Sequence, residues 1–174
     1  PSVNGQLPLY LYAHSMGGAI GALYLEAWPD TFQKAVLSAP MLSLSMGALP
    51  IPCARALGRI MIRLNRGATY PPGQHPFTPG DAFETSCSSC RQRYDYYREK
   101  KEANPLFQTC GSSYGWAYEA LNACHHVTQK KNCRRITVPV LVFQSTNDTT
   151  VTSSGIERFV ANTPSAALVK VDQS

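Results

Sequence analysis

A serine set between an apolar run and a helical repeat is the feature that most constrains this chain. The segment Leu9–Ile20 begins as an apolar run typical of a strand, reaches Ser15, and continues with apolar residues at helical spacing. The residues two before and two after the serine, Ala13 and Gly17, are small, as a sharp strand-to-helix turn requires. The sequence therefore predicts a strand, an abrupt turn at Ser15, and a helix from residue 16 to about residue 27.

Such a turn would give Ser15 a chemical role. A serine there stands at the N-terminus of a helix, where unpaired N–H groups and the positive end of the helix dipole favour negative charge. We interpret the turn as a nucleophile elbow, with Ser15 as the candidate nucleophile and the backbone N–H of Met16 as the candidate oxyanion-hole donor. The simpler interpretation is a strand, a turn and a helix with an N-cap serine.

Three further apolar runs indicate strands of the same sheet, at residues 35–38, 138–143 and 167–171. A helix is expected between the last two, opened by the capping-box pattern from Ser154 to Glu157. Strands that alternate with helices are typical of a parallel sheet, so the sequence predicts an α/β fold.

The middle of the chain interrupts this alternation. Residues 41–135 contain no convincing strand, and seven prolines divide them into helices and loops. We therefore expect three parts. Residues 1–40 carry the serine turn and the next strand, residues 41–135 form a helical cap inserted over the strand ends, and residues 136–174 return to the sheet.

The predicted cap concentrates the positive charge. Residues 41–135 carry 13 Lys and Arg against 6 Asp and Glu, a net charge of +7, whereas the rest of the chain is at −2. One helix there has an apolar face and a basic face, formed respectively by Ala54, Leu57, Ile60, Met61 and Leu64 and by Arg55, Arg59 and Arg63. Such a helix either lies on an anionic membrane or packs on a domain. The basic and aromatic segment 91–101 has no RNA-binding signature, so we expect a charged surface helix and no nucleic-acid partner.

All six cysteines also lie in this middle part: Cys53, Cys87, Cys90, Cys110, Cys124 and Cys133. An even number is compatible with disulfides, and a zinc site would draw on Cys87, Cys90, Cys124, His125, His126 and Cys133. The second closely spaced cysteine pair that marks a zinc ribbon is missing. We expect reduced cysteines and no metal.

A serine nucleophile of this kind needs an acid and a histidine base, in the chain order serine, acid, histidine. Asp148 is the candidate acid, because it follows the strand at 138–143 at its carboxyl end, where ligands gather in such sheets. Asp172 comes too late in the chain to precede a histidine. All four histidines precede Asp148: His14, His75, His125 and His126. We therefore expect the catalytic histidine beyond Ser174, further strands before Pro1, and an incomplete fragment that is inactive alone.

Several stretches resemble the bacterial lysophospholipase branch of the α/β-hydrolases, the serine aminopeptidase S33-like group that also contains the monoacylglycerol lipases. These stretches are Ala13–Ala19 and Leu37–Met41 in the predicted sheet, and Arg91–Tyr94, Asn104–Pro105 and Tyr114–Trp116 in the predicted cap. The cap segments are similar to those of inner-membrane lysophospholipases. The resemblance covers nearly the whole chain and implies the C-terminal part of an α/β-hydrolase parallel sheet with an inserted helical cap.

Carried over by position, the resemblance implies Ser15 as nucleophile, the Met16 N–H as oxyanion donor and Asp148 as acid. It implies hydrolysis of carboxylic esters of single-chain lipids, foremost lysophospholipids, through an acyl-enzyme and with no metal or organic cofactor. Monoacylglycerols or general carboxylic esters are the alternative substrates. The family and the basic cap imply a cytoplasmic protein or one attached peripherally to the inner membrane. An alternative from another class is an inactive binding module that keeps the fold.

Overall fold

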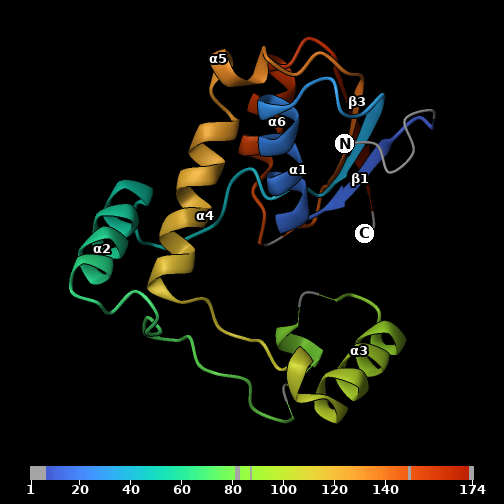
Figure 1. The fold of residues 1–174 in the computed structure, drawn as a ribbon. Coiled ribbons are helices and arrows are strands. Elements are labelled where there is room, and N and C mark those ends of the chain that lie inside the picture. Colours follow the sequence, from blue (N-terminus) through green and yellow to red (C-terminus); the bar gives the residue numbers. More distant parts are fainter. Residues whose placement is uncertain (1–6, 81–82, 87, 149, 173–174) are drawn as a thin grey trace. The chain divides into compact units, whose positions relative to one another are not determined.

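The computed structural model of this protein describes residues 7–80, 83–86, 88–148 and 150–172 (Figure 1). The chain divides into two compact units. The first contains Pro1–Ile51 and Glu119–Ser174, and the second contains Pro52–Tyr118. In sequence, the second unit falls within the segment 41–135 that interrupts the alternation of strands and helices.

The first unit is built on a four-stranded parallel sheet. Its strands lie across the sheet in chain order: β1 (Tyr10–His14), β2 (Lys34–Ser38), β3 (Val140–Ser145) and β4 (Ala166–Val171). Each neighbouring pair is parallel, so the four carboxyl ends lie at one edge. The prediction of a parallel α/β sheet is confirmed. The third strand begins and ends two residues later than the run 138–143 suggested.

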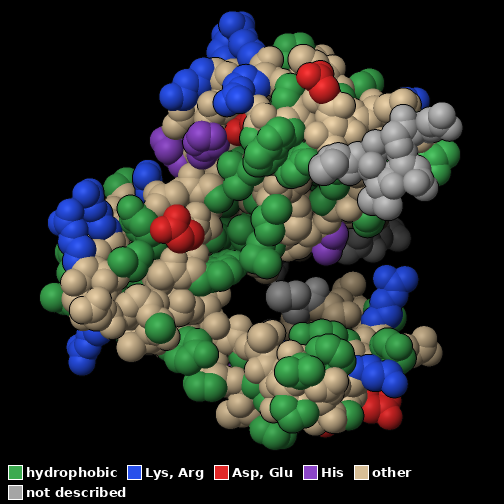
Figure 2. Space-filling model, viewed as in Figure 1, with side chains coloured by type: hydrophobic (Ala, Val, Ile, Leu, Met, Phe, Trp, Pro, Cys, Tyr) green, Lys and Arg blue, Asp and Glu red, His purple; other side chains and the backbone are tan. Residues whose placement is uncertain are grey.

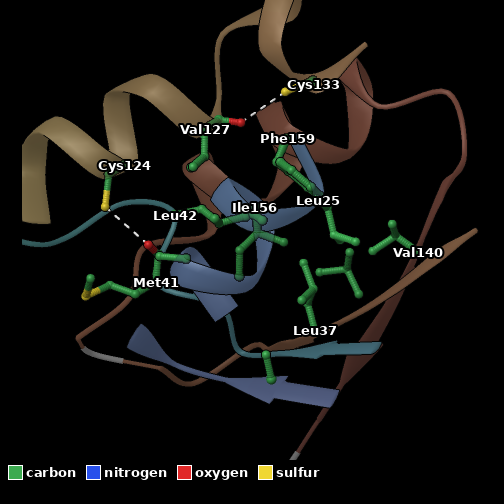
Figure 3. Packing of buried hydrophobic residues seen from close by; sticks show 14 of the residues in the cluster. Leu25, Leu37, Met41, Leu42, Cys124, Val127, Cys133, Val140, Ile156 and Phe159 are labelled. Carbon is green, nitrogen blue, oxygen red and sulfur yellow. Dashed lines mark hydrogen bonds between the residues drawn. The ribbon is translucent and has the colours of Figure 1, made fainter. Parts of the chain in front are cut away.

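Two helices, α1 (Met16–Ala27) and α6 (Ser153–Asn162), cover one face of this sheet (Figure 1). Strand residues on that face, such as Leu37 and Val142, are fully buried. They join Leu25 of α1 and Phe159 of α6 in one hydrophobic core (Figure 3). Burial of each such side chain stabilises the fold by about 1.5–3 kcal/mol. The predicted helix over residues 16–27 is confirmed at both ends.

The opposite face of the sheet is apolar and open. Leu11 and Ala13 point toward α1, so the alternating residues Tyr10 and Tyr12 point to the other face. These two tyrosines are 61% and 72% exposed, and Val169 of β4 is also exposed. Because parallel sheets are normally covered on both faces, this unit has a surface that further chain can cover.

The second unit is helical where it is described. Its elements are α2 (Ile51–Arg63), two short 3₁₀ turns at Phe83–Thr85 and Pro105–Phe107, α3 (Arg91–Ala103), and the start of α4 (Tyr114–Val127). The chain returns to the first unit through α4 and α5 (Lys130–Cys133). Between residues 41 and 135 the described positions hold one isolated bridge and no strand. None of the helices described is both long and apolar enough to cross a bilayer.

The start of α6 differs from the sequence prediction. The capping box from Ser154 to Glu157 is wrong, because the N-cap residue is Thr152 and no side-chain capping bond forms there. Glu157 instead pairs with Lys170 of β4 at 3.0 Å. The N–H of Gly155 donates to the hydroxyl of Ser43 at 3.1 Å. Because Ser43 is distant in the sequence, this hydrogen bond to the start of α6 produces no local capping pattern.

Candidate active site

Ser15 lies at the junction of β1 and α1 in a strained conformation. Its φ of 51° and ψ of −122° fall in a region that residues with a side chain rarely adopt, at a cost of about 1–3 kcal/mol. Its N–H donates to the carbonyl of Ser38 at 3.1 Å, and its carbonyl accepts N–H bonds from Gly18 at 2.9 Å and Met41 at 2.8 Å. These bonds hold the sharp turn between β1 and α1 against the end of β2, which is the backbone geometry of a nucleophile elbow.

The two glycines after the serine have different roles. A Cβ added at Gly18 would lie 2.5 Å from the Cβ of Pro40, the residue that follows β2 and Ala39. At Gly17 an added Cβ would meet no described atom within 4 Å. Gly18 is therefore the position of this turn that cannot hold a side chain, whereas Gly17 can.

The N–H of Met16 is available at the start of α1. As the first residue of the helix, Met16 has no acceptor one turn earlier, and no described backbone carbonyl takes its N–H. The N–H stands beside Ser15 at the positive end of the helix dipole. That position suits a donor to a developing oxyanion.

Asp148 follows β3 at the same edge of the sheet as Ser15. Its Oδ1 accepts the N–H groups of Thr150 and Val151, each at 2.9 Å. Its Oδ2 has no hydrogen bond to any described residue. Since β2 lies between β1 and β3, the axes of the outer two are roughly 10 Å apart. A base that bridges Ser15 and Asp148 would stand above the end of β2.

Two of the histidines lie far from this edge. The Nε2 of His126 is 3.2 Å from Oε2 of Glu26, near the opposite end of α1. Glu26 comes eleven residues after Ser15, about 16 Å along the helix, so neither His126 nor its neighbour His125 reaches the serine. His14 lies on the open face of the sheet, with Nδ1 3.4 Å from the hydroxyl of Ser38. His75 belongs to the second unit.

Glu26 is a buried carboxyl that the sequence did not single out. Burial raises its pKa to about 7, and the nearby Arg135 opposes this rise. Although His126 is close, neither carboxyl oxygen has a hydrogen bond to a described residue. Its place beside Ala19 and Ala22 on the inner face of α1 was the available signal in the sequence.

The buried cysteines are structural. Cys124 donates its S–H to the carbonyl of Met41 at 3.2 Å, and Cys133 donates to that of Val127 at 3.1 Å (Figure 3). Burial raises the pKa of Cys124 to about 11 and also raises that of Cys133, which disfavours the thiolate that metals bind. The described cysteines are all free thiols, while Cys87 lies outside the described residues. No three His, Cys, Asp or Glu side chains gather as a metal site in the described part of the chain.

The family model for the serine aminopeptidases S33 (Hydrolase_4) matches residues 2–171. A monoacylglycerol lipase from Paleococcus ferrophilus has a similar structure, with 20% identity, a TM-score of 0.69, and coverage of 95% of this chain and 59% of that one. A soluble variant of monoglyceride lipase from Saccharomyces cerevisiae, in complex with a substrate analogue, has 17% identity, a TM-score of 0.67, and coverage of 97% and 54%.

The chain thus spans little more than half the length of these two lipases. No curated protein matches it. At such low identity the structural likeness establishes the α/β-hydrolase fold, and the family model, which covers nearly every residue, establishes the family. This chain belongs to the serine aminopeptidase S33 family of α/β hydrolases.

Proposed function

We propose that the protein containing this chain is a serine hydrolase that cleaves carboxylic esters of single-chain lipids. The observation that carries the proposal is the strained turn at Ser15, at the same sheet edge as Asp148. Backbone strain of this kind is retained where a serine must stand exposed for chemistry. Membership of a hydrolase family supports the same reaction class.

In the proposed reaction the Ser15 hydroxyl attacks the ester carbonyl, and the Met16 N–H stabilises the resulting oxyanion. A histidine from residues after Ser174 takes the serine proton and returns it to the leaving alcohol. Asp148 orients that histidine through Oδ2, the oxygen with no hydrogen bond to a described residue. Water then hydrolyses the acyl-enzyme.

The proposal includes a longer protein. The open apolar face around Tyr10 and Tyr12 supports further strands and helices that cover it, since parallel sheets are buried on both sides. Lipase structures nearly twice as long as this chain support the same view. Residues 41–135 would then be the cap inserted over the strand ends, between the parts 1–40 and 136–174.

Two lipid classes are candidate substrates. Lysophospholipids are favoured by the net charge of +7 in residues 41–135, which attracts a phosphate headgroup. Monoacylglycerols are favoured by the two lipases of similar structure. The two substrates can share one acyl chain, so a comparison between them isolates the headgroup.

The test is hydrolysis by the full-length protein of a lysophospholipid and a monoacylglycerol with the same acyl chain. We expect Ser15→Ala to abolish turnover and labelling by a fluorophosphonate, and Asp148→Asn to lower kcat by about four orders of magnitude, as loss of the triad acid does elsewhere. Ser45→Ala is the matched control, because the Ser45 hydroxyl has no hydrogen bond to a described residue. A full-length protein that turns over no ester and takes no label would instead be the inactive binding module.

We also propose that α2 docks on anionic lipid. Leu57 and Ile60 of α2 form an apolar stripe with Leu64, the residue that follows the helix, and the three are 40%, 53% and 62% exposed. Arg59 and Arg63 are exposed beside the stripe, and Figure 2 shows Lys and Arg side chains gathered with hydrophobic ones over α2. Apolar and basic side chains on one helix fit the boundary between acyl chains and anionic headgroups. Peripheral attachment to the inner membrane from the cytoplasmic side would follow.

Vesicle sedimentation of the full-length protein tests this docking. The double variant Arg59→Gln and Arg63→Gln should bind vesicles with anionic lipid about 30-fold more weakly, at about 1 kcal/mol for each arginine. Lys130→Gln and Lys131→Gln on α5 remove the same charge from another exposed site and serve as the control. Equal loss in both double variants would mean that net charge alone drives binding, and the docking role of α2 would be refuted.

A further inference from the structure

The hydroxyl of Ser43, in the loop after β2, makes all the hydrogen bonds that it can. Its O–H donates to the carbonyl of Thr152 at 2.7 Å, and its oxygen accepts the N–H of Gly155 at 3.1 Å. The hydroxyl of Thr152 is its third partner. One donor and two acceptor positions are all that a serine hydroxyl offers, so this side chain is committed to a segment more than a hundred residues away.

The backbones of the same two segments also pair. Leu44 forms an antiparallel bridge with Val151, and the N–H of Ser45 donates to the carbonyl of Thr150 at 3.3 Å. Val151 is only 5% exposed and belongs to the hydrophobic core. The loop after β2 therefore fixes residues 150–152 in place.

Residues 150 and 151 are the ones that hold Asp148. The N–H groups of Thr150 and Val151 both donate to Oδ1 of this aspartate at 2.9 Å. The direction of the carboxyl group is therefore set by the position of two N–H groups, and that position is set by the loop after β2. Asp148 itself is exposed, so the described packing offers no other constraint on its side chain.

The start of α6 packs tightly against the loop after β2 at Gly155. A Cβ at Gly155 would lie 2.4 Å from the carbonyl oxygen of Leu42 and 2.5 Å from the hydroxyl of Ser43. Leu42 is buried in the core (Figure 3). The loop after β2 is thus held by two sets of contacts. Leu42 packs in the hydrophobic core, and Ser43 bonds to the segment that follows Asp148.

We infer that Ser43 is a positioning residue for Asp148, acting through Thr152, Val151 and Thr150. The inference rests on the proposed function, in which Asp148 orients the catalytic histidine. A displacement of reacting groups by about 1 Å can lower a rate about a hundredfold. A loosened Asp148 segment should therefore lower kcat and leave substrate binding intact.

The test compares Ser43→Ala, Ser43→Thr and the control Ser45→Ala in the full-length enzyme. We expect Ser43→Ala to lower kcat about 10- to 100-fold with KM within about twofold, because misplacement of a reacting group has effects of this size. Hydrogen exchange at the N–H groups of Thr150 and Val151 should become faster. Ser43→Thr keeps the hydroxyl and should restore kcat, and Ser45→Ala should match the wild type.

Thr152→Val adds an independent measurement, because it removes one partner of Ser43 without touching Asp148. The effects of Ser43→Ala and Thr152→Val on kcat should be less than additive in the double variant, as expected for coupled residues. If Ser43→Ala keeps wild-type kcat while Asp148→Asn is impaired, the inference is overturned and the proposed function stands. If Asp148→Asn keeps wild-type activity, Asp148 is not the acid and the inference falls with that assignment, whereas the proposed hydrolase activity is overturned only if the full-length protein turns over no ester.

Discussion

Glu26 combines deep burial with an ionisable carboxyl, and this makes stability depend on pH. Its pKa rises from 4.5 to about 7 on folding, mainly because burial disfavours the charged form. The folded state therefore binds more protons than the unfolded state between these values, and stability falls as the pH rises from about 4.5 to about 7. A rise of this size corresponds to about 3 kcal/mol.

Glu26→Gln should remove this pH dependence, because the amide resembles the protonated carboxyl and does not titrate. We expect the variant to be more stable than the wild type at pH 8, by up to about 3 kcal/mol, and similar to it near pH 4.5. Urea unfolding of the full-length protein across this range measures the difference. Glu119→Gln, at an exposed position of α4, is the control. The same loss of stability with pH in Glu26→Gln would contradict the prediction.

Ser15 keeps a strained backbone that glycine would adopt freely. With φ at 51°, Ser15→Gly should be more stable than Ser15→Ala by about 1 kcal/mol, even though both variants lose the proposed nucleophile. Thermal unfolding of the two variants side by side measures the strain without reference to activity. Equal stabilities would mean that the turn relaxes when the serine is removed.

At the scale of elements, the contact between α1 and the loop after β2 depends on Gly18. Gly18→Ala would force a Cβ against Pro40 and should cost about 1–3 kcal/mol. Gly17→Ala, one residue earlier in the same turn of helix, meets no described atom within 4 Å and should leave stability unchanged or raise it by up to about 1 kcal/mol. Chemical denaturation of both variants makes the comparison, and a larger loss for Gly17→Ala would refute this account of the turn.

The elements that the sequence predicts well are those with local signals. The helix 16–27 shows its apolar spacing and ends before Pro29, and the bounds agree with α1. The strand pattern near 138–143 predicted the right element with shifted ends, because backbone pairing with β4 continues through the polar residues Gln144 and Ser145, which an apolar pattern does not include. The capping box at Ser154 failed since Ser43, far away in sequence, supplies the hydrogen bond.

In the candidate site, too, the sequence predicts the residues that have local signals and misses those that depend on distant contacts. The small residues around Ser15 and the strand before Asp148 are local patterns, and they locate both residues at one sheet edge. Ser43 has no such pattern, because its role depends on a pairing between the loop after β2 and residues 150–152. Glu26 shares a helix face with the apolar Ala19 and Ala22, but only the fold shows that its carboxyl is buried.

For the whole molecule, the four-stranded sheet determines what else the protein needs. One face is packed by α1 and α6, and the other presents Tyr10, Tyr12 and Val169 to solvent. An apolar sheet face of this kind favours association unless more chain covers it. We propose that the full-length protein supplies that cover, and that the 174-residue chain alone binds hydrophobic dyes and hydrolyses no ester.

Tyr12→Asp tests whether further chain covers the open face or leaves it exposed to solvent, because Tyr12 is 72% exposed in the structure. If further chain covers the open face, the variant should destabilise the full-length protein by about 3–5 kcal/mol, as loss of a buried aromatic side chain does. Tyr96→Asp is the matched control, since Tyr96 of α3 is 66% exposed and lies in the second unit. It should change stability by less than about 1 kcal/mol. Chemical denaturation of both variants decides the matter, and an equally small effect of Tyr12→Asp would mean that the face stays open in the full-length protein.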